Sequence, residues 1–415
     1  MSSFCQERML LGRPCGRPAY VDPASGLPSD KCIFHCYKET GGFTEFQNAL
    51  DAYLSSNPKD YDFHRFVFPC RGWKFPSVFP ECAYFNYAVF KGDVYFGLTR
   101  FQKKAVFTEV TFEGRANFCT AKFNWDGFFL NSEFRSLVDF AGAEFCLGQT
   151  DFRFCKFRGD VTFFDCKFQK GVAFPFARFE KAVDFRDTLF GGNSDFSEAV
   201  FAEPERVTFS GNNLSHVSFA RCNIAKTIFQ RVEWLGIPVW PKAGILRRWI
   251  RNGVVDELPS SGQVNHEDLA QTYRRLQHNY MENYRYSEAG DFFVGERESL
   301  RRGKVKWRQY ASIDFLYKLA SLYGESYTLP FVWLAVLLLL TPLALLAAVG
   351  SDCNVTYWHA FLENLELFIF PRIPDASCAA TAVSRLTICT EKVLVVLFVS
   401  LLLLALRRKF KRKSF

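Results

Sequence analysis

The sequence predicts a β-solenoid joined by a helical linker to two transmembrane helices. Phenylalanine recurs at alternating steps of five and six residues through the first half of the 415-residue chain, and a small residue stands two positions before nearly every ring. The second half contains an uncharged stretch of 26 residues, Ser326 to Ser351. Because helices have a period of 3.6 and strands a period of 2, the Phe spacing fits neither alone. Fixed self-similarity over many copies is typical of a solenoid.

The repeat runs from Phe85 to Phe229 as F-x4-F-x5, with Leu214 and Ile224 replacing Phe and longer steps before Phe152 and Phe209. Residues i and i−2 of an extended segment point to the same side, so each face places one large and one small side chain inward and then turns a corner. Four faces close a coil of about 22 residues. The 27 inward positions therefore predict nearly seven coils.

This repeat resembles the pentapeptide-repeat family in its Phe-centred form. The resemblance implies a right-handed quadrilateral β-helix with Phe stacked on Phe in the interior. A helical solenoid is the alternative, but the segment lacks long amphipathic periods and is rich in Gly and β-branched residues. We predict that the rings form a core and bind nothing, and that Cys155, Cys166 and Cys222 fill small inward positions.

The remaining segments cover or continue this β-helix, because the open edges at its ends must be protected. In the helical linker, Asn265 is placed to cap a helix whose apolar face starts at Leu269 and Tyr273, and Gly290 and Gly303 mark breaks. The predicted divisions are a Cys/His-rich segment (1–50), an N-terminal cap (51–84), the β-helix (85–234), a C-terminal cap and linker (235–264), a cytoplasmic helical linker (265–325), a first transmembrane helix (326–350), an outer loop (351–385), a second transmembrane helix (386–406) and a basic tail (407–415).

The N-terminal segment predicts a structural zinc site. Residues 5 to 36 read CQERMLLGRPCGRPAYVDPASGLPSDKCIFHC. This stretch has too few apolar residues to build its own core, and thiolates with an imidazole suit tetrahedral zinc. We predict Cys5, Cys15, Cys32 and His35 as ligands, with Cys36 as a substitute for His35. Reduced free cysteines are the alternative, and disulfides are disfavoured in a cytosolic segment.

The two apolar runs predict a two-pass protein of the inner (plasma) membrane. The first run is long enough to cross about 30 Å of hydrocarbon, and the second, 386–406, carries Glu391 and Lys392 near its interface. Basic residues concentrate before the first run and after the second, so both termini are expected in the cytoplasm. The N-terminus shows no signal-peptide core. Cys353 and Cys378 then lie outside, where a disulfide can form.

The outer loop contains an amphipathic helix, 357–370, that either lies flat in the interface or dips inward as a pore helix. The candidate pore or re-entrant residues are Trp358, Glu363, Glu366 and Phe370. The order span, short helix, span resembles the pore module of two-span cation channels. The linker and first span resemble bacterial pentapeptide-repeat proteins with a channel-like C-terminus. A potassium filter needs a TVGYG-type loop, whereas this chain has IFPRIP, so potassium selectivity is not supported.

The remaining patterns bear on which classes of function to expect. The chain shows no P-loop, GxSxG, HExxH or Rossmann glycine pattern, so we expect no enzyme. The repeat carries 18 Lys/Arg against 17 Asp/Glu, unlike the acidic family members that imitate DNA, and we expect no nucleic-acid partner. The basic tail fits anionic lipid. Two hypotheses follow: a homo-oligomeric, channel-like pore controlled or assembled by the β-helix, or a non-conducting membrane-tethered scaffold that binds a cytoplasmic protein.

Overall fold

The computed structural model describes residues 4–21, 29–36, 43–56, 58–70, 72–239, 250–258, 264–349, 356–358, 361–362, 364–365 and 382–411. The chain divides into two compact units, Met1–Glu282 and Asn283–Phe415. The first unit contains the β-helix and the elements at its two ends, and the second contains the remaining helices.

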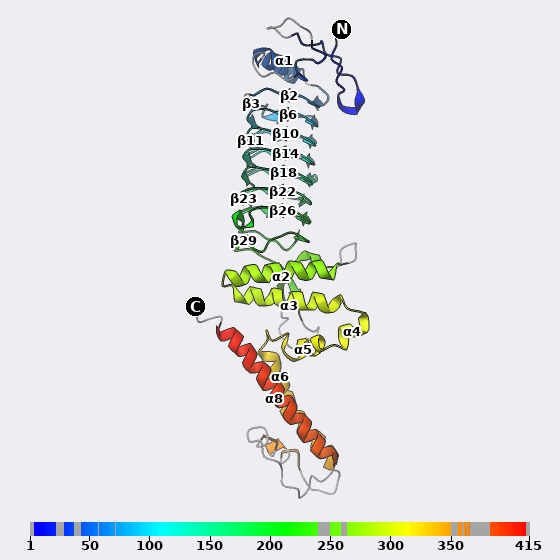
Figure 1. Ribbon diagram of the computed structural model, residues 1–415, viewed down its shortest axis with the longest axis vertical. Coiled ribbons are helices and arrows are strands. Elements are labelled where there is room, and N and C mark those ends of the chain that lie inside the picture. Colours follow the sequence, from blue (N-terminus) through cyan, green and yellow to red (C-terminus); the bar gives the residue numbers. More distant parts are fainter. Residues whose placement is uncertain are drawn as a thin grey trace. The chain divides into compact units, whose positions relative to one another are not determined.

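Four parallel sheets form the sides of the β-helix (Figure 1). One holds β1 (Tyr61–Asp62), β5 (Ala83–Tyr84), β9 (Ala105–Val106), β13 (Gly127–Phe128), β17 (Thr150–Asp151), β21 (Val172–Ala173), β25 (Ser194–Asp195) and β28 (Val217–Ser218). The next holds β2 (Val67–Phe68), β6 (Val89–Phe90), β10 (Thr111–Phe112), β14 (Glu133–Phe134), β18 (Lys156–Phe157), β22 (Arg178–Phe179) and β26 (Val200–Phe201). The third holds β3 (Trp73–Lys74), β7 (Val94–Tyr95), β11 (Ala116–Asn117), β15 (Val138–Asp139), β19 (Val161–Thr162), β23 (Val183–Asp184), β27 (Val207–Ser210) and β29 (Ile228–Gln230). The fourth holds β4 (Val78–Phe79), β8 (Arg100–Phe101), β12 (Lys122–Phe123), β16 (Glu144–Phe145), β20 (Lys167–Phe168) and β24 (Leu189–Phe190).

The strand register confirms the predicted coil. Phe90 pairs with Phe112, which pairs with Phe134, so one turn takes 22 residues. The rings of Phe112 and Phe134 stack with their centroids 4.7 Å apart and their planes within 2°. Every predicted inward position from Phe85 to Phe229 is buried, as are the three predicted inward cysteines. The prediction of a β-solenoid with a core of stacked Phe rings is confirmed.

The coil starts earlier than the repeat suggested. Strands β1 to β4 form a further turn within residues 51–84, the range assigned to the N-terminal cap. Its inward rings are Phe63, Phe68, Phe75 and Phe79, all buried, but their spacing of five, seven and four residues breaks the period. The stretch FHRFVFPCRGWKFPSVFP indicates an imperfect coil in the sequence, and these irregular steps explain why the regular period can be followed only from Phe85.

Two corners of each coil require a left-handed backbone. At one corner the N–H of Ala88 donates to the carbonyl of Phe85 at 2.9 Å, and Tyr87 between them has φ 59°. Asn131 and Gly142, residue types that tolerate this conformation well, occupy equivalent corners with φ 58° and 64°. The chain therefore turns at each corner through a backbone geometry that repeats from coil to coil.

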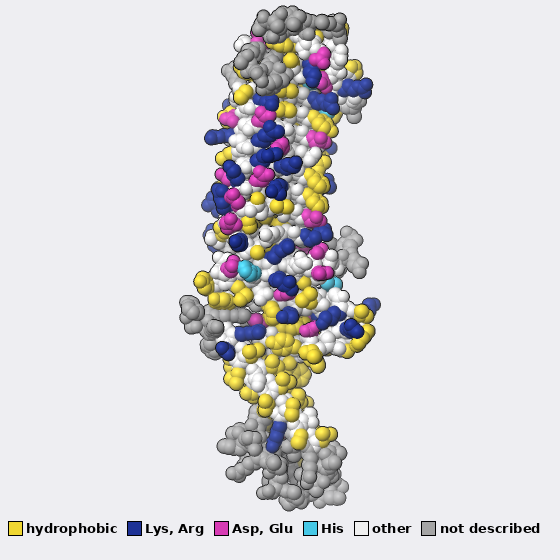
Figure 2. Space-filling model, in the orientation of Figure 1, with side chains coloured by type: hydrophobic (Ala, Val, Ile, Leu, Met, Phe, Trp, Pro, Cys, Tyr) yellow, Lys and Arg dark blue, Asp and Glu magenta, His cyan; other side chains and the backbone are white. Residues whose placement is uncertain are grey.

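Charged side chains on the outer surface pair between neighbouring coils. Glu144 binds Lys122 at 2.9 Å and Lys167 at 3.0 Å, one coil to either side, and Glu113 binds Lys91 at 2.7 Å. Figure 2 shows basic and acidic side chains interspersed along the visible face of the β-helix. Exposed pairs of this kind contribute at most about 1 kcal/mol each. They account for the near balance of charge within the repeat and leave the Phe core as its main source of stability.

Helices and short elements cover the two ends of the coil within the first unit (Figure 1). At one end are η1 (Leu10–Gly12) and α1 (Phe43–Ser55). At the other are a two-stranded antiparallel sheet of β30 (Leu235–Pro238) and β31 (Ile250–Gly253), η3 (Val255–Glu257) and α2 (His266–Glu282). Another short helix, η2 (Pro204–Arg206), fills the long step before Phe209.

Helix α2, predicted as part of the cytoplasmic linker, covers the last coil. Its predicted N-cap is confirmed, since Asn265 Oδ1 accepts from the N–H of Glu267 at 3.1 Å. Its predicted apolar face is buried. The side-chain amide of Asn279 donates to the carbonyls of Ile224 at 3.2 Å and Thr227 at 2.6 Å. This side chain therefore satisfies backbone acceptors that would otherwise be unpaired at the open edge.

We expect Asn279→Ala to lower the free energy of unfolding of the first unit by about 2 kcal/mol, because two buried carbonyls lose their donor. Chemical denaturation of the full chain in detergent, followed by β-sheet circular dichroism, measures this change. Gln277→Ala is the matched control, since Gln277 is a partly exposed residue of the same helix whose side chain contacts Met281 across an exposed hydrogen bond. Equal midpoints for the two variants would show that Asn279 does not stabilise the coil end.

The second unit contains α3 (Tyr286–Arg302), α4 (Lys306–Tyr310), α5 (Ile313–Ser321), α6 (Thr328–Val349) and α8 (Ala382–Lys411). The predicted break at Gly303 is confirmed, because this residue caps the C-terminus of α3. The predicted break at Gly290 was wrong, since Gly290 lies buried within α3. The chain turns instead before α3, at Tyr284, whose φ of 59° lies in the left-handed region and cannot continue a helix.

A buried carboxylate, Glu298, joins α3 to α5 and to the segment before α6. It accepts hydrogen bonds from Arg301 at 2.7 Å, Lys318 at 3.0 Å and Tyr323 at 3.3 Å. Burial alone would raise the pKa of Glu298, but the hydrogen bond from Arg301 and the charge of Lys318 outweigh it and hold the pKa well below its usual range. The ionised form of this side chain therefore stabilises the fold.

Because the folded-state pKa of Glu298 is lowered, its contribution to stability is complete above the ordinary value of 4.5 and is lost as the pH falls through the folded value. We expect Glu298→Gln to lower the free energy of unfolding at pH 7 by about 2 kcal/mol and to flatten the loss of stability on acidification. Thermal unfolding in detergent across the pH range measures both effects. Glu288→Gln, on the same helix and paired with Arg285, is the control. An unchanged pH profile in Glu298→Gln would contradict the prediction.

Helices α6 and α8 pair in opposite directions. Arg408, near the end of α8, donates to the carbonyl of Tyr323, just before α6, at 3.3 Å. Further along, the rings of Trp333 and Phe398 stack with centroids 6.1 Å apart. Among the described residues, one helical stretch, Cys389–Arg408, is long and apolar enough to cross a membrane, and α6 has a shorter apolar stretch, Thr328–Ala344. This finding supports membrane association of the second unit.

Candidate metal centre

The chain brings the first two predicted metal ligands together by folding residues 4–18 back on itself. Isolated antiparallel bridges join Phe4 to Pro18 and Arg8 to Pro14, and η1 closes the turn between them. The N–H of Cys5 donates to the carbonyl of Arg17, and the N–H of Cys15 to that of Glu7, both at 2.9 Å. The nine residues between the two cysteines are therefore spanned by paired backbone, which explains how so wide a spacing serves one site.

The four predicted ligands, Cys5, Cys15, Cys32 and His35, converge at a single point. Their ligand atoms all lie within 4.8 Å of one another. Nδ1 of His35 is 3.3 Å from Sγ of Cys5 and 3.2 Å from Sγ of Cys32, and the Sγ atoms of Cys15 and Cys32 are 3.7 Å apart. A tetrahedral zinc with bonds of about 2.1 to 2.3 Å separates its ligand atoms by roughly 3.5 to 3.8 Å. The cluster therefore has the size and the donor set to hold such an ion.

The second nitrogen of His35 fixes which ring nitrogen faces the cluster. Nε2 lies 3.1 Å from the backbone carbonyl of His64. A carbonyl oxygen only accepts hydrogen bonds, so Nε2 carries the proton and Nδ1 presents a lone pair toward the three sulfurs. A donor bond from the remote nitrogen to a carbonyl is the usual support for a metal-binding histidine. Because His64 belongs to the first coil, this bond also ties the cluster to the β-helix.

One of the three sulfur atoms, that of Cys15, is already biased toward thiolate. The hydrogen bond with Cys32 and the neighbouring His35 lower the pKa of Cys15, while the contact with Cys15 raises that of Cys32. Arg17 adds a positive charge, since its guanidinium donates to Sγ of Cys15 at 3.6 Å. Three thiolates around a divalent ion leave a net charge of minus one, which this guanidinium offsets.

The cluster closes the N-terminal end of the Phe core. The N–H of Val67 donates to the carbonyl of Phe34 at 2.7 Å, and the ring of Phe34 stacks on Phe66 with centroids 4.5 Å apart. Phe34 lies between Cys32 and His35, so the segment that supplies two ligands also packs a ring against the N-terminal end of the core. Arg17 packs over both rings, 5.0 Å from the centroid of Phe34 and 5.4 Å from that of Phe66. Such a site is suited to holding a fold together, with all four positions filled by protein side chains.

The other predicted site residues have different fates. Cys36, the substitute for His35, lies outside the cluster, and its sulfur accepts from the hydroxyl of Ser29 at 3.8 Å. Trp358 is described and exposed. The remaining pore or re-entrant candidates, Glu363, Glu366 and Phe370, lie outside the described residues, as do both cysteines of the predicted disulfide, Cys353 and Cys378.

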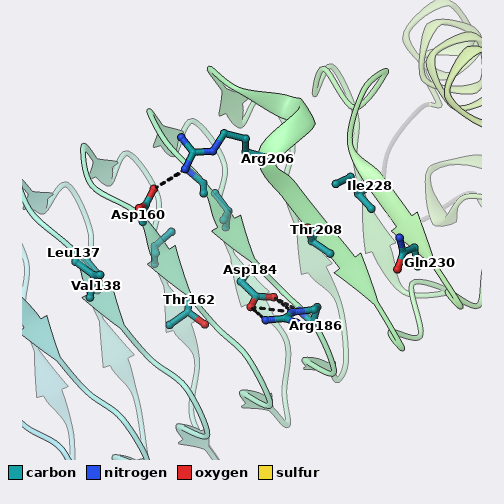
Figure 3. A pocket seen from close by; sticks show the side chains of 13 residues that line it. Leu137, Val138, Asp160, Thr162, Asp184, Arg186, Arg206, Thr208, Ile228 and Gln230 are labelled. Atoms are coloured by element: carbon teal, nitrogen blue, oxygen red, sulfur yellow. Dashed lines mark hydrogen bonds and ion pairs between the residues drawn. The ribbon is translucent and has the colours of Figure 1, made fainter. Parts of the chain in front are cut away.

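A shallow groove of about 510 Å³ crosses one side of the β-helix (Figure 3). Buried Val138, Val161 and Val183 contribute to its floor. At its rim Arg206, from η2, lies 3.6 Å from Asp160, and Arg186 binds Asp184 at 2.6 Å. Because both acids are paired with arginines, the groove has the character of a contact surface and not of an acid–base site. The long step before Phe209 is the only sequence signal for it.

Comparison with known proteins supports the repeat. A family profile described as pentapeptide repeats (9 copies) matches residues 77–119. Searches of curated proteins and of solved structures returned no match. The matched residues span β4 to β11 and contain the same Phe columns that continue through the later coils. The chain therefore contains a β-helix built of pentapeptide repeats.

Proposed function

We propose that this chain is a two-span protein of the inner (plasma) membrane, with both termini in the cytoplasm. Its zinc-closed β-helix would then be a rigid platform for a cytoplasmic protein partner. The observation that carries this proposal is the surface of the α6–α8 pair. Exposed apolar side chains lie on both helices, including Phe331 and Leu340 of α6 and Val393, Val396 and Leu403 of α8. An exposed apolar surface of this extent is suited to lipid.

The antiparallel pairing supports a second span. The bond from Arg408 to Tyr323, just before α6, and the stacking of Trp333 on Phe398 hold the first part of α6 beside α8. We propose that α6, which is apolar and antiparallel to α8, crosses the same hydrocarbon layer. The basic residues that flank the start of α6 and the end of α8 favour the cytoplasmic side for both ends.

Membrane extraction and tag accessibility test the topology. We expect the full chain to stay with the membrane after alkaline carbonate washing, and tags after Phe415 and before Met1 to react only once cells are permeabilised. A chain released by carbonate would reject the membrane proposal. A C-terminal tag reactive in intact cells would reject the two-span topology.

The platform proposal concerns the β-helix surface. Stacked Phe rings fill the core, and we find no catalytic constellation among the described residues, so we propose binding and not catalysis. The groove lined by Asp160, Asp184 and Arg206 is a recess on this surface that a partner could enter. Proximity labelling with the wild type and with Arg206→Glu, against Arg178→Glu on another side of the coil, tests it. A partner lost only in Arg206→Glu supports the platform, and identical labelling in all three chains counts against this groove.

A channel-like homo-oligomer is the second candidate, and one feature favours it. Glu391 in α8 lies near Asn364 and near Thr341 of α6. All three are buried, and Oε1 of Glu391 and Oδ1 of Asn364 have no hydrogen-bond partner among the described residues. Ionisable groups buried between membrane helices commonly mark ion pathways. Conductance in planar bilayers that Glu391→Gln alters would support a pore, and a silent wild type under all ionic conditions would reject it.

A further inference from the structure

Helix α5 has its polar and apolar faces reversed for a helix on a water-exposed surface. Ile313 and Leu316 point outward and are 85% and 63% exposed. The polar residues of the helix, Asp314, Lys318 and Ser321, lie on the opposite face according to the helical period. A helix on a soluble surface places its apolar stripe inward. The reversal indicates that the medium outside α5 is apolar.

The polar residues of α5 are paired within the unit, Ser321 at a buried position, Lys318 at a largely buried one and Asp314 at a partly exposed one. Lys318 donates to the buried Glu298 at 3.0 Å. Asp314 pairs with Lys304 in the turn before α4. The hydroxyl of Ser321 accepts from the N–H of Gly324 at 3.0 Å. Turning the helix to hide Ile313 and Leu316 would break the contacts of Lys318 and Asp314 with the other elements, whereas the bond at Ser321 closes the end of α5 itself.

The segment that leads into α5 has the composition of a membrane interface. Trp307 and Tyr310 of α4 are exposed, and exposed Lys306 and Arg308 stand beside them. The guanidinium of Arg308 lies 5.1 Å from the Trp307 ring centroid. Tryptophan and tyrosine favour the headgroup level, and basic residues there attract anionic lipid. Figure 2 shows hydrophobic and basic side chains close together in the region of α4.

The exposed face is continuous with the membrane pair. Helix α6 begins at Thr328, seven residues after α5 ends, and Trp333 Nε1 of α6 donates to the carbonyl of Leu319 of α5 at 3.0 Å. The outward side of α5 thus adjoins the start of the helix that we propose enters the bilayer. The apolar residues and the neighbouring basic residues then meet the acyl boundary and the phosphates of the same leaflet.

We propose that α4 and α5 form an interfacial segment that binds anionic phospholipid of the cytoplasmic leaflet. In this arrangement Ile313 and Leu316 enter the acyl boundary, and Lys306 and Arg308 contact lipid phosphates. The inference rests on the proposed membrane pair of α6 and α8. Its consequence is that the depth of this pair and the tilt of α3 are set by lipid contacts as well as by the spans.

Site-specific photocrosslinking of the full chain tests this proposal. Leu316→p-benzoylphenylalanine is reconstituted in nanodiscs of phosphatidylcholine with phosphatidylglycerol, irradiated and examined for lipid adducts by mass spectrometry. Leu403→p-benzoylphenylalanine, at an exposed position of α8, reports on the membrane pair itself. Val200→p-benzoylphenylalanine, at an exposed position of the β-helix, is the negative control.

We expect lipid adducts at positions 316 and 403 and none at 200. Adducts at 403 without adducts at 316 would overturn the interfacial segment and leave the membrane pair intact, whereas their absence at both would reject the membrane pair as well. With both Lys306→Gln and Arg308→Gln added, the phosphatidylglycerol share of the adducts at 316 should fall by about fivefold per charge. An unchanged share would overturn the preference for anionic lipid.

Discussion

Replacing Phe163 by alanine is expected to lower the free energy of unfolding of the β-helix by about 3–5 kcal/mol. Phe163 is fully buried in the middle of the coil, and its ring stacks between Phe140 at 5.1 Å and Phe185 at 5.2 Å. The cavity left in this column cannot collapse easily, because stacked strands of adjoining coils hold the neighbouring rings at a fixed spacing.

The adjacent residue provides a matched control. Phe164 has the same side chain but points outward and is 41% exposed. Its ring lies 5.5 Å from the guanidinium of Arg186, measured to the ring centroid. We expect Phe164→Ala to cost less than about 1 kcal/mol. Denaturant unfolding of both variants in detergent, followed by circular dichroism near 218 nm, a wavelength typical of β-sheet, measures the difference. Equal losses would contradict the assignment of inward and outward positions.

Loss of a metal ligand is expected to have the other large effect. Wild-type chain purified without chelators should contain a zinc ion per molecule, and Cys32→Ser should lose it, because a buried thiolate that contacts both Cys15 and His35 is removed. Structural zinc sites contribute on the order of 10 kcal/mol to folding, so the N-terminal segment should open while the distal coils remain. Elemental analysis and limited proteolysis of residues 1–60 measure the two effects.

Cys36→Ser is the control for this prediction. Cys36 lies four residues from Cys32 but outside the cluster, and its substitution should leave both zinc content and protease resistance unchanged. Zinc retained in Cys32→Ser, or lost in Cys36→Ser, would show that the cluster is not the binding site. Wild-type chain that contains no metal would favour the alternative of reduced free cysteines.

The regular part of the fold was predictable because one residue type does one repeated job. A Phe stands at nearly every inward position of the repeat, so the spacing of Phe alone predicted which residues from Phe85 to Phe229 face the core. The first coil was visible only as an imperfect one, because Trp73 occupies the small position before Phe75 and the steps around it are uneven. Periodicity detects a coil only where its corners have a constant length.

The two ends of the coil were harder to predict than its middle. The apolar face of α2 was visible in the sequence. The hydrogen bonds from Asn279 of α2 to the backbone carbonyls of Ile224 and Thr227 were not, because backbone acceptors do not show in a pattern of side chains. The four metal ligands were recognisable as thiols and an imidazole in a segment without a core. Arg17 and the carbonyl of His64 were not, because an arginine among prolines and a backbone oxygen carry no metal-binding signature.

The identical register between neighbouring coils has an evolutionary consequence. Since Phe112 meets Phe90 and Phe134 through the same pairing, a duplicated stretch of 22 residues would insert into the stack without disturbing either terminus. Each such duplication would lengthen the rod by one strand spacing, about 4.8 Å. The length of the β-helix can therefore change between homologous chains in whole turns of 22 residues, while the elements at its two ends keep their own contacts.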